Sequence, residues 1–222
     1  MRRQSKTVTV RGVAIGGGSR VTVQSMTNTD TADRDATLAQ IRALERCGCD
    51  IVRFTVNSAA AVANIPYFLE HTPLPLVADI HFDYKLAIDA AEAGISKIRI
   101  NPGNIGDDDR VRAVARTCAR LGVPVRVGVN GGSLERQIAA KYGAPTAEAL
   151  AESALYHASL LERFDFDDIV LSVKSSDVAA MAAANAILAE KTDYPLHIGV
   201  TEAGGGRMGL IKGAVGIGGT LL

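Results

Sequence analysis

The chain contains seven short β-like runs, each ending in polar residues and followed by a segment with helical character. Four of these runs carry a cation where a buried strand is usually apolar: Arg53, Arg99, Arg126 and Lys174. Successive strand residues face opposite sides, so one side of each strand is apolar and the other carries charge. Because an unpaired buried charge costs too much free energy to retain, several cations converging on one interior indicate an anionic ligand. We expect a phosphorylated one.

The alternation of strands and helices predicts a parallel sheet with right-handed crossovers. A doubly wound sheet would place a glycine-rich loop after its first strand, but residues 24–29 contain no glycine. Polar residues instead accumulate where the strands end, as in a TIM-type barrel. The predicted strands are residues 21–26, 51–56, 76–81, 97–101, 123–130, 169–174 and 196–201.

We therefore predict an α/β fold in which residues 1–222 form one (β/α)8 TIM-type barrel, truncated after about seven βα units. An N-terminal hairpin is expected to pair residues 7–10 with residues 21–23 through a turn at Gly16-Gly17-Gly18, since glycine readily adopts positive φ. A barrel that lacks its eighth strand leaves two bare edges. We therefore expect the chain to be part of a longer protein.

Charge and cysteine content restrict the function classes. The 24 basic and 24 acidic residues cancel, which argues against a nucleic-acid or membrane-surface partner, because such proteins usually carry a basic surplus. No apolar run suits a membrane span or a signal peptide, so a cytoplasmic location is expected. The cysteines Cys47, Cys49 and Cys118 have neither zinc nor iron–sulfur spacing, and we predict no metal site in this chain.

Six motifs occur in order along almost the whole chain and resemble the 4-hydroxy-3-methylbut-2-enyl diphosphate synthase family, specifically its amino-terminal barrel. They are VQSMTNTD at 23–30, ADIHFDY at 78–84, KIRINPGNIG at 97–106, GVNGGSLE at 128–135, SVKSSD at 172–177 and HIGVTEAG at 197–204.

The resemblance implies an oxidoreductase of the methylerythritol phosphate route to isoprenoids. Its members reductively open 2-C-methyl-D-erythritol 2,4-cyclodiphosphate and remove a hydroxyl, leaving an allylic alcohol diphosphate. Electrons from flavodoxin or ferredoxin pass through a 4Fe–4S cluster, whose carboxyl-terminal domain faces the barrel of the partner subunit in a homodimer. This chain departs from that pattern, because the eighth strand and the cluster domain are absent and its cysteines do not match the cluster ligands. We expect the fragment alone to be inactive.

The predicted substrate contacts follow from the charge of a cyclic diphosphate. Guanidinium forks and an ammonium group suit phosphate oxygens, and asparagine amides can donate hydrogen bonds without adding charge. Some cations could instead pair with barrel carboxylates for structural reasons alone. The substrate-binding candidates are Arg53, Arg99, Asn101, Arg126, Asn130 and Lys174.

The catalytic candidates are three further polar residues. Asp79 and His81 lie two apart and share a strand face, where they could relay a proton, orient an arginine or bind a metal. Glu202, at the end of the seventh strand, is the better acid, because losing a hydroxyl as water requires a proton that a desolvated glutamate can supply. Nearby cations would instead lower its pKa.

Two other functions stay open from the sequence. Lys174 could act as the Schiff-base nucleophile of a phosphate-binding aldolase or pterin-type synthase, which requires a desolvated lysine. Alternatively, the segment could bind a diphosphate without turning it over. His71 and His157 are predicted to be surface or packing residues.

Overall fold

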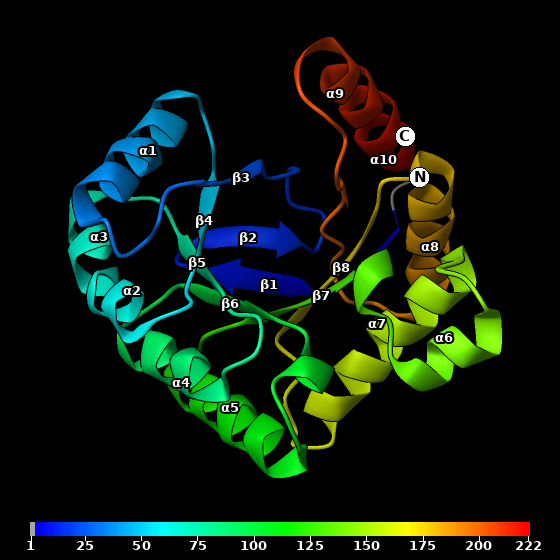
Figure 1. Cartoon of the computed structure of the whole chain (residues 1–222), viewed down its shortest axis with the longest axis horizontal. Coiled ribbons are helices and arrows are strands. Elements are labelled where there is room, and N and C mark those ends of the chain that lie inside the picture. Colours follow the sequence, from blue (N-terminus) through cyan, green and yellow to red (C-terminus); the bar gives the residue numbers. More distant parts are fainter. Residues whose placement is uncertain (1–2) are drawn as a thin grey trace.

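The computed structural model describes residues 3–222, in which seven parallel strands form one curled sheet in the order β3-β4-β5-β6-β7-β8-β9 (Figure 1). Sequential neighbours pair throughout, as the strand–helix alternation predicts. The predicted barrel-type α/β fold is confirmed, together with an N-terminal hairpin. The sheet strands are β3 (Gln24–Met26), β4 (Ile51–Thr55), β5 (Leu76–Asp79), β6 (Lys97–Ile100), β7 (Val125–Asn130), β8 (Ile169–Ser175) and β9 (Gly199–Val200).

The helices lie outside the curled sheet (Figure 1). Most begin at a side chain that accepts a hydrogen bond from the first turn, as Asp33 does from the backbone N–H of Ala36, which stabilises a helix start. The longer helices are α1 (Arg34–Arg46), α2 (Ala59–Ala63), α3 (Ile65–His71), α4 (Tyr84–Glu92), α5 (Asp108–Leu121), α6 (Arg136–Tyr142), α7 (Ala147–Glu162), α8 (Val178–Lys191) and α9 (Gly206–Gly213). The other helical segments are the 3₁₀ turns η1 (Pro102–Asn104) and η2 (Gly131–Ser133), the π-helix η3 (Ala214–Gly218) and the short α10 (Gly219–Leu221).

The hydrophobic core lies between the sheet and this outer layer. Apolar residues that alternate along the strands, among them Phe54, Ile98 and Leu171, are fully buried in one cluster with the inner faces of the helices. Their strand neighbours point the other way. The helices thus cover the apolar side, and the interior of the curled sheet receives the polar residues.

The N-terminal hairpin differs from the sequence prediction in its second strand. β1 (Thr7–Val10) pairs antiparallel with β2 (Val13–Gly16), so the pairing predicted with residues 21–23 is wrong. Its turn is Arg11-Gly12, with φ of 45° and 84°, and two residues of positive φ match the twist of a tight hairpin. The chain therefore reverses at Arg11-Gly12 and not at the glycine run of residues 16–18, where the sequence analysis placed the turn.

The hairpin covers the amino-terminal end of the sheet. Val8 and Val10 pack against Val170, near the start of β8. The Arg11 guanidinium donates to carbonyl oxygens in the segment before β5, including that of Leu69 at 3.2 Å. This end is therefore filled by protein, and a ligand can approach from the carboxyl ends of the strands.

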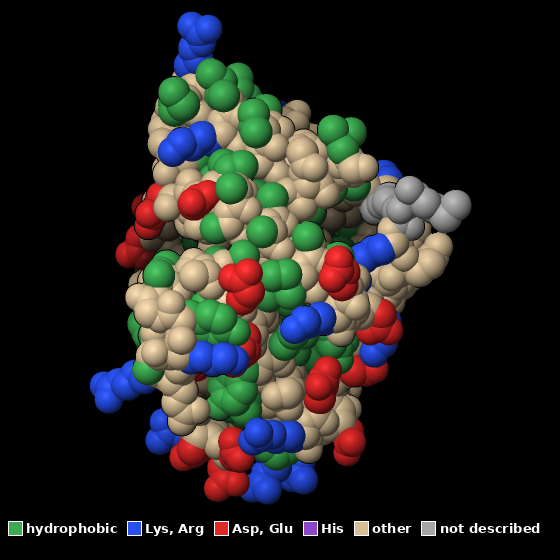
Figure 2. All heavy atoms as spheres, turned by 90° about the vertical axis from the view of Figure 1, so that its right-hand side faces the viewer, with side chains coloured by type: hydrophobic (Ala, Val, Ile, Leu, Met, Phe, Trp, Pro, Cys, Tyr) green, Lys and Arg blue, Asp and Glu red, His purple; other side chains and the backbone are tan. Residues whose placement is uncertain are grey.

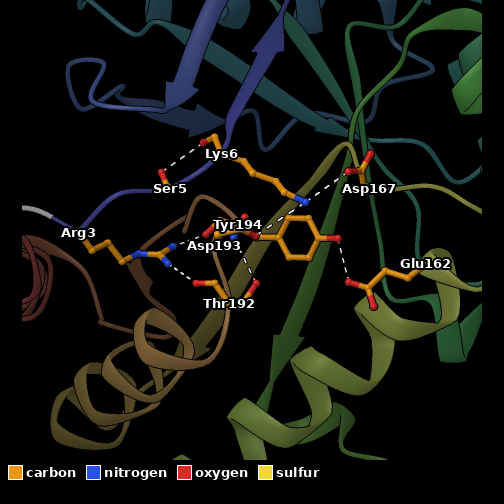
Figure 3. Close-up of polar contacts among 8 residues, drawn as sticks. All are labelled: Arg3, Ser5, Lys6, Glu162, Asp167, Thr192, Asp193 and Tyr194. Carbon is orange, nitrogen blue, oxygen red and sulfur yellow. Dashed lines mark hydrogen bonds and ion pairs between the residues drawn. The ribbon is translucent and has the colours of Figure 1, made fainter.

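Residues just before the hairpin are tied to the loop that precedes β9 (Figure 3). The Arg3 guanidinium donates to the carbonyl oxygens of Thr192 and Tyr194. Lys6 Nζ lies 3.3 Å from Asp167 Oδ2 and 4.8 Å from the centroid of the Tyr194 ring. The Tyr194 hydroxyl in turn donates to Glu162 of α7 at 2.8 Å.

The sheet stays open between its edge strands β3 and β9, since no strand pairing joins them within residues 3–222. A groove of about 940 Å³ lies there, lined by residues before β3 such as Val21 and by Leu196, Ile198 and the last helical turns. Exposed hydrophobic side chains gather over α9 and η3, on the upper part of the face in Figure 2. Over the described range, the helices are too short or too polar to cross a membrane.

Candidate functional site

A cavity of about 190 Å³ opens at the carboxyl ends of the strands. Asn101 and Glu202 are the two predicted site residues that are not among its described lining residues. The lining consists of Arg53, Asp79, His81, Arg99, Arg126, Gly128, Val129, Asn130, Ser172, Lys174 and Thr201.

Asp79 is the centre of the charge arrangement. Its carboxylate is 4% exposed, and its Oδ1 accepts a hydrogen bond from Arg99 at 3.0 Å. Its Oδ2 lies 3.6 Å from Arg53 Nε and 3.6 Å from His81 Nε2. Burial alone would raise the pKa of Asp79, but contact with His81 and the charges of Arg99 and Arg53 hold it well below its ordinary value. An ionised Asp79 therefore orients the two guanidinium groups.

Arg126 forms the floor of the cavity and is fully buried. One nitrogen donates to Ser172 Oγ at 2.9 Å, while its Nε and a second terminal nitrogen have no hydrogen-bond partner among the described residues. Burial lowers the pKa of Arg126 well below its ordinary value, and the nearby charges of Arg53 and Arg99 add to this effect. A buried guanidinium with spare donors is stable only with an anion near it.

Lys97 is a buried cation that the sequence analysis missed. It begins β6, two residues before Arg99, and is completely buried. Burial, followed by the charges of Arg126 and Arg53, lowers its pKa to about 7. The strand period that places Arg99 inward places Lys97 inward too, so the signal was present in the sequence.

Two inward-facing glycines leave room for the cationic side chains. A Cβ atom at Gly128 would lie 2.2 Å from Arg99 Nε, and one at Gly199 would lie 3.0 Å from Lys174 Cε. Arg99 also donates to the Gly128 carbonyl oxygen at 3.2 Å. Each cation therefore passes close to the backbone of a neighbouring strand, where the missing Cβ atom leaves room for it. A side chain at Gly128 would require the Arg99 guanidinium to shift, and one at Gly199 would require Lys174 to move by a few tenths of an ångström.

Lys174 and Lys97 predict a specific pH dependence of stability. Burial and the adjacent arginines lower the pKa of Lys174 to about 7, whereas the pKa of a lysine in the unfolded chain is about 10.4. Between these values the unfolded chain binds more protons, so the stability of the ligand-free chain should rise with pH from about 7 towards 10. The slope is at most about 1.4 kcal/mol per pH unit for each lysine.

Urea unfolding at several pH values between 7 and 9.5 measures this slope. Lys174→Met should remove a large part of it, while Lys191→Met, on the surface of α8, should leave it unchanged. A wild-type stability that stays flat or falls across this window would show that neither lysine has a lowered pKa.

The two asparagines occupy equivalent positions in neighbouring loops. Asn101 Oδ1 accepts from the Gly103 N–H at 3.3 Å, and Asn130 Oδ1 accepts from the Gly132 N–H at 3.2 Å. Asn101 Nδ2 is buried without a hydrogen-bond partner in the described part of the chain. Asn130 lines the cavity, whereas Asn101 lies in the adjoining loop.

Glu202 lies in the loop after β9 with an exposed side chain. Its φ of 51° is in the left-handed region, which is uncommon for a residue other than glycine. Its neighbour Thr201 lines the cavity. Strained backbone of this kind recurs near functional sites, but here the carboxylate itself points to solvent.

The described residues do not fit an iron–sulfur cluster. They contain no group of three or more His, Cys, Asp or Glu side chains that could hold a metal ion. Cys47 is exposed and Cys118 is buried, and burial raises the pKa of Cys118 to about 12. A cluster ligand has to be a thiolate, so such a thiol is unsuited to the role.

Fold and site together define a TIM-barrel-type protein with a cation-lined cavity at the carboxyl ends of its strands. Residues 5–222 match the family model described as the GcpE TIM-barrel domain, and the chain belongs to that family. The resemblance read from the six motifs is thereby confirmed.

Relatives named 4-hydroxy-3-methylbut-2-en-1-yl diphosphate synthase (flavodoxin) cover almost the entire chain. The protein from Symbiobacterium thermophilum is 54% identical over 217 residues, which are 98% of this chain and 59% of the relative. The protein from Clostridium perfringens is 52% identical over 221 residues, which are 100% of this chain and 63% of the relative. The chain thus spans about three fifths of the length of these relatives.

Solved structures with low sequence identity share the fold alone. Type I 3-dehydroquinate dehydratase from Clostridium difficile aligns with a TM-score of 0.69 at 13% identity, covering 94% of this chain and 84% of that protein. Dihydropteroate synthase from Yersinia pestis aligns with a TM-score of 0.62 at 15% identity, covering 86% of this chain and 74% of that protein.

Proposed function

We propose that the chain is the substrate-binding barrel of a 4-hydroxy-3-methylbut-2-en-1-yl diphosphate synthase, which reductively opens 2-C-methyl-D-erythritol 2,4-cyclodiphosphate. The observation that carries the proposal is the fully buried Arg126, which lines the cavity and has two nitrogens without a hydrogen-bond partner among the described residues. A diphosphate supplies the acceptor oxygens and negative charge that these donors lack.

The balance of charge supports the same ligand. Arg53, Arg99, Arg126 and Lys174 line the cavity, and Asp79 is the only carboxylate among its described lining residues. Arg99 Nε is also buried without a partner in the described range. Two adjacent phosphates would satisfy guanidinium forks that come from three different strands. His81 and Asn130 would complete the polar contacts at the mouth.

Titration calorimetry of the chain tests this proposal directly. The cyclic diphosphate should bind at least about tenfold more tightly than 2-C-methyl-D-erythritol 4-phosphate, which corresponds to about 1.4 kcal/mol. Equal affinity for the two compounds would mean that the cavity does not recognise a diphosphate. The fragment alone should show no turnover with a reduced electron donor, so that binding and chemistry are separable.

Glu202 is the proposed source of the proton for hydroxyl loss, which requires its exposed side chain to turn towards the cavity when the ligand binds. The Asp79–His81 pair, which lines the cavity, is the alternative. Glu202→Gln in the full-length protein should abolish turnover while changing ligand affinity by less than about tenfold, or 1.4 kcal/mol, because the amide keeps the shape but supplies no proton. Steady-state assays and calorimetry measure the two effects. Glu190→Gln, on α8, is the control. Undiminished turnover in Glu202→Gln would show that Glu202 is not the proton donor and would leave the Asp79–His81 pair as the candidate.

The remaining parts of the activity are proposed to lie outside residues 1–222. The ligands of the 4Fe–4S cluster would come from a further domain, and the eighth strand of the barrel would lie between β3 and β9. Flavodoxin, which the names of the relatives mention, or ferredoxin would supply the electrons. The homodimer and the cytoplasmic location expected from the sequence stay predictions.

Lys174 keeps one alternative function open. It lines the cavity and its pKa is lowered to about 7, so a large fraction of the amine is unprotonated and nucleophilic at neutral pH. Borohydride reduction in the presence of a phosphorylated ketone would trap a Schiff base on Lys174 if the protein were an aldolase-type enzyme. The reductase proposal expects no adduct on Lys174 with the phosphorylated ketone.

A further inference from the structure

His157 is a fully buried imidazole that the proposed chemistry does not use. It lies on α7, which packs against the η1 turn after β6 and against α6 after β7. Its ring therefore stands between two loops at the carboxyl end of the sheet. The sequence predicts a packing residue here, but the polar contacts of the ring indicate a more specific role.

Both ring nitrogens of His157 are engaged, each by a different loop. Nδ1 lies 3.1 Å from the backbone nitrogen of Gly103, and Nε2 forms a hydrogen bond with Glu135 Oε1. A backbone N–H can only donate, so Nδ1 must accept. The ring proton therefore sits on Nε2 and is donated to the Glu135 carboxylate, which fixes one neutral tautomer.

The close approach of the ring also explains Gly103. A Cβ atom at that position would lie 2.4 Å from His157 Cε1. Only glycine lets the imidazole reach the backbone of this loop. The PGN sequence of the loop and the histidine 54 residues later are thus parts of one contact.

The two loops carry the asparagines of the proposed ligand site. The Gly103 N–H donates to His157 Nδ1 and also to Asn101 Oδ1, at 3.3 Å. The other amide atom of Asn101, Nδ2, is buried without a partner among the described residues. Glu135 follows the η2 turn. Asn130 is the N-cap residue of that turn and lines the cavity. The chain Gly103–His157–Glu135 therefore connects the loop of Asn101 to the loop of Asn130.

We propose that His157 is a positioning residue, which fixes the Gly103 loop from Glu135 and thereby sets the asparagine side chains beside the anion cavity. This inference rests on the proposed function, because its consequence is the affinity for a diphosphate. A fully buried imidazole is costly unless both nitrogens are satisfied. The hydrogen bonds of His157 therefore hold the two loops in one conformation before a ligand binds, and such preorganisation lowers the entropy cost of binding.

Amide hydrogen exchange of the whole chain tests the connection without any ligand. Glu135→Ala should accelerate exchange of the Gly103 amide by roughly five- to tenfold, as for the loss of one hydrogen bond, although Glu135 reaches Gly103 only through His157. Glu152→Ala is the matched control, because Glu152 bonds Lys141 and Tyr142 of α6 instead. Unchanged Gly103 protection in Glu135→Ala would overturn the proposal.

Affinity for inorganic pyrophosphate tests the consequence. His157→Asn keeps an acceptor at the Nδ1 position but loses the donor to Glu135, and should bind about twofold more weakly than wild type. His157→Gln lacks the acceptor for Gly103 and should bind about fivefold more weakly. His157→Gln combined with Asn101→Ala should be no weaker than Asn101→Ala alone, because both act on one group. Equal losses in the two histidine variants, or multiplying losses in the double variant, would show a merely structural histidine. A wild type that does not bind pyrophosphate would refute the proposed function, and the exchange result would still decide the role of His157.

Discussion

Arg126→Met should make the ligand-free chain more stable and at the same time abolish its affinity for a diphosphate. The native guanidinium is fully buried with two unpartnered nitrogens. Replacing buried charge by an apolar side chain of similar volume is often stabilising by about 1–4 kcal/mol. Losing the donors from a buried charge-assisted contact costs about 2–5 kcal/mol of binding, which is roughly 30- to 5,000-fold in affinity.

Misfolding would lower both stability and affinity, so a gain in stability together with a loss of affinity would not be explained by it. Urea unfolding reports the gain in stability, and calorimetry with pyrophosphate reports the loss of affinity. Arg112→Met is the control, because Arg112 is an exposed residue of α5 that pairs with Asp109 at 2.6 Å, and it should change both quantities little. A destabilised Arg126→Met that still binds pyrophosphate would mean that Arg126 is a structural cation.

Asp79→Asn should have the reverse effect on stability. The change leaves Arg99 and Arg53 without the carboxylate that lies 3.0 Å and 3.6 Å from them. Breaking one partner of a buried ion pair costs about 3–5 kcal/mol. Pyrophosphate should restore part of the loss, because an anion bound to the folded state supplies the missing charge. Thermal unfolding with and without pyrophosphate measures both effects.

The pH dependence of Asp79→Asn provides a second readout. The folded pKa of Asp79 lies well below its unfolded value, so its contribution is fully present above about pH 4 and is lost as the pH falls. The variant should therefore lose less stability than wild type on acidification below that value. Asp109→Asn, at an exposed pair, should follow the wild-type curve. An Asp79→Asn curve parallel to that of wild type would show that Asp79 is not the paired carboxylate.

The strand period was the strongest predictive signal in this sequence. Alternation alone places Arg53, Arg99, Arg126 and Lys174 on the inner face together with Asp79, and the cavity contains all five. It applies equally to Lys97, which a search for cations inside strands passes over because it stands at the first strand position. The edge strands β3 and β9 are shorter than predicted, since each has a partner on one side only.

Loop residues were less predictable, because their direction depends on backbone angles and on distant contacts. Glu202 lies two residues after the end of β9, with a left-handed φ and an exposed side chain. The role of His157 depends on partners 54 and 22 residues away. Helical periodicity identifies its buried face, but no local pattern encodes which loops meet there.

The inward-facing glycines have a consequence for how substitutions in this protein should be interpreted. Gly128 and Gly199 carry no charge, yet the paths of the Arg99 and Lys174 side chains depend on them. An alanine at Gly128 would force the Arg99 guanidinium to shift, and an alanine at Gly199 would push Lys174 aside by a smaller amount. The positions of the charges in the cavity therefore depend partly on uncharged residues, and a comparison restricted to charged positions would overlook them.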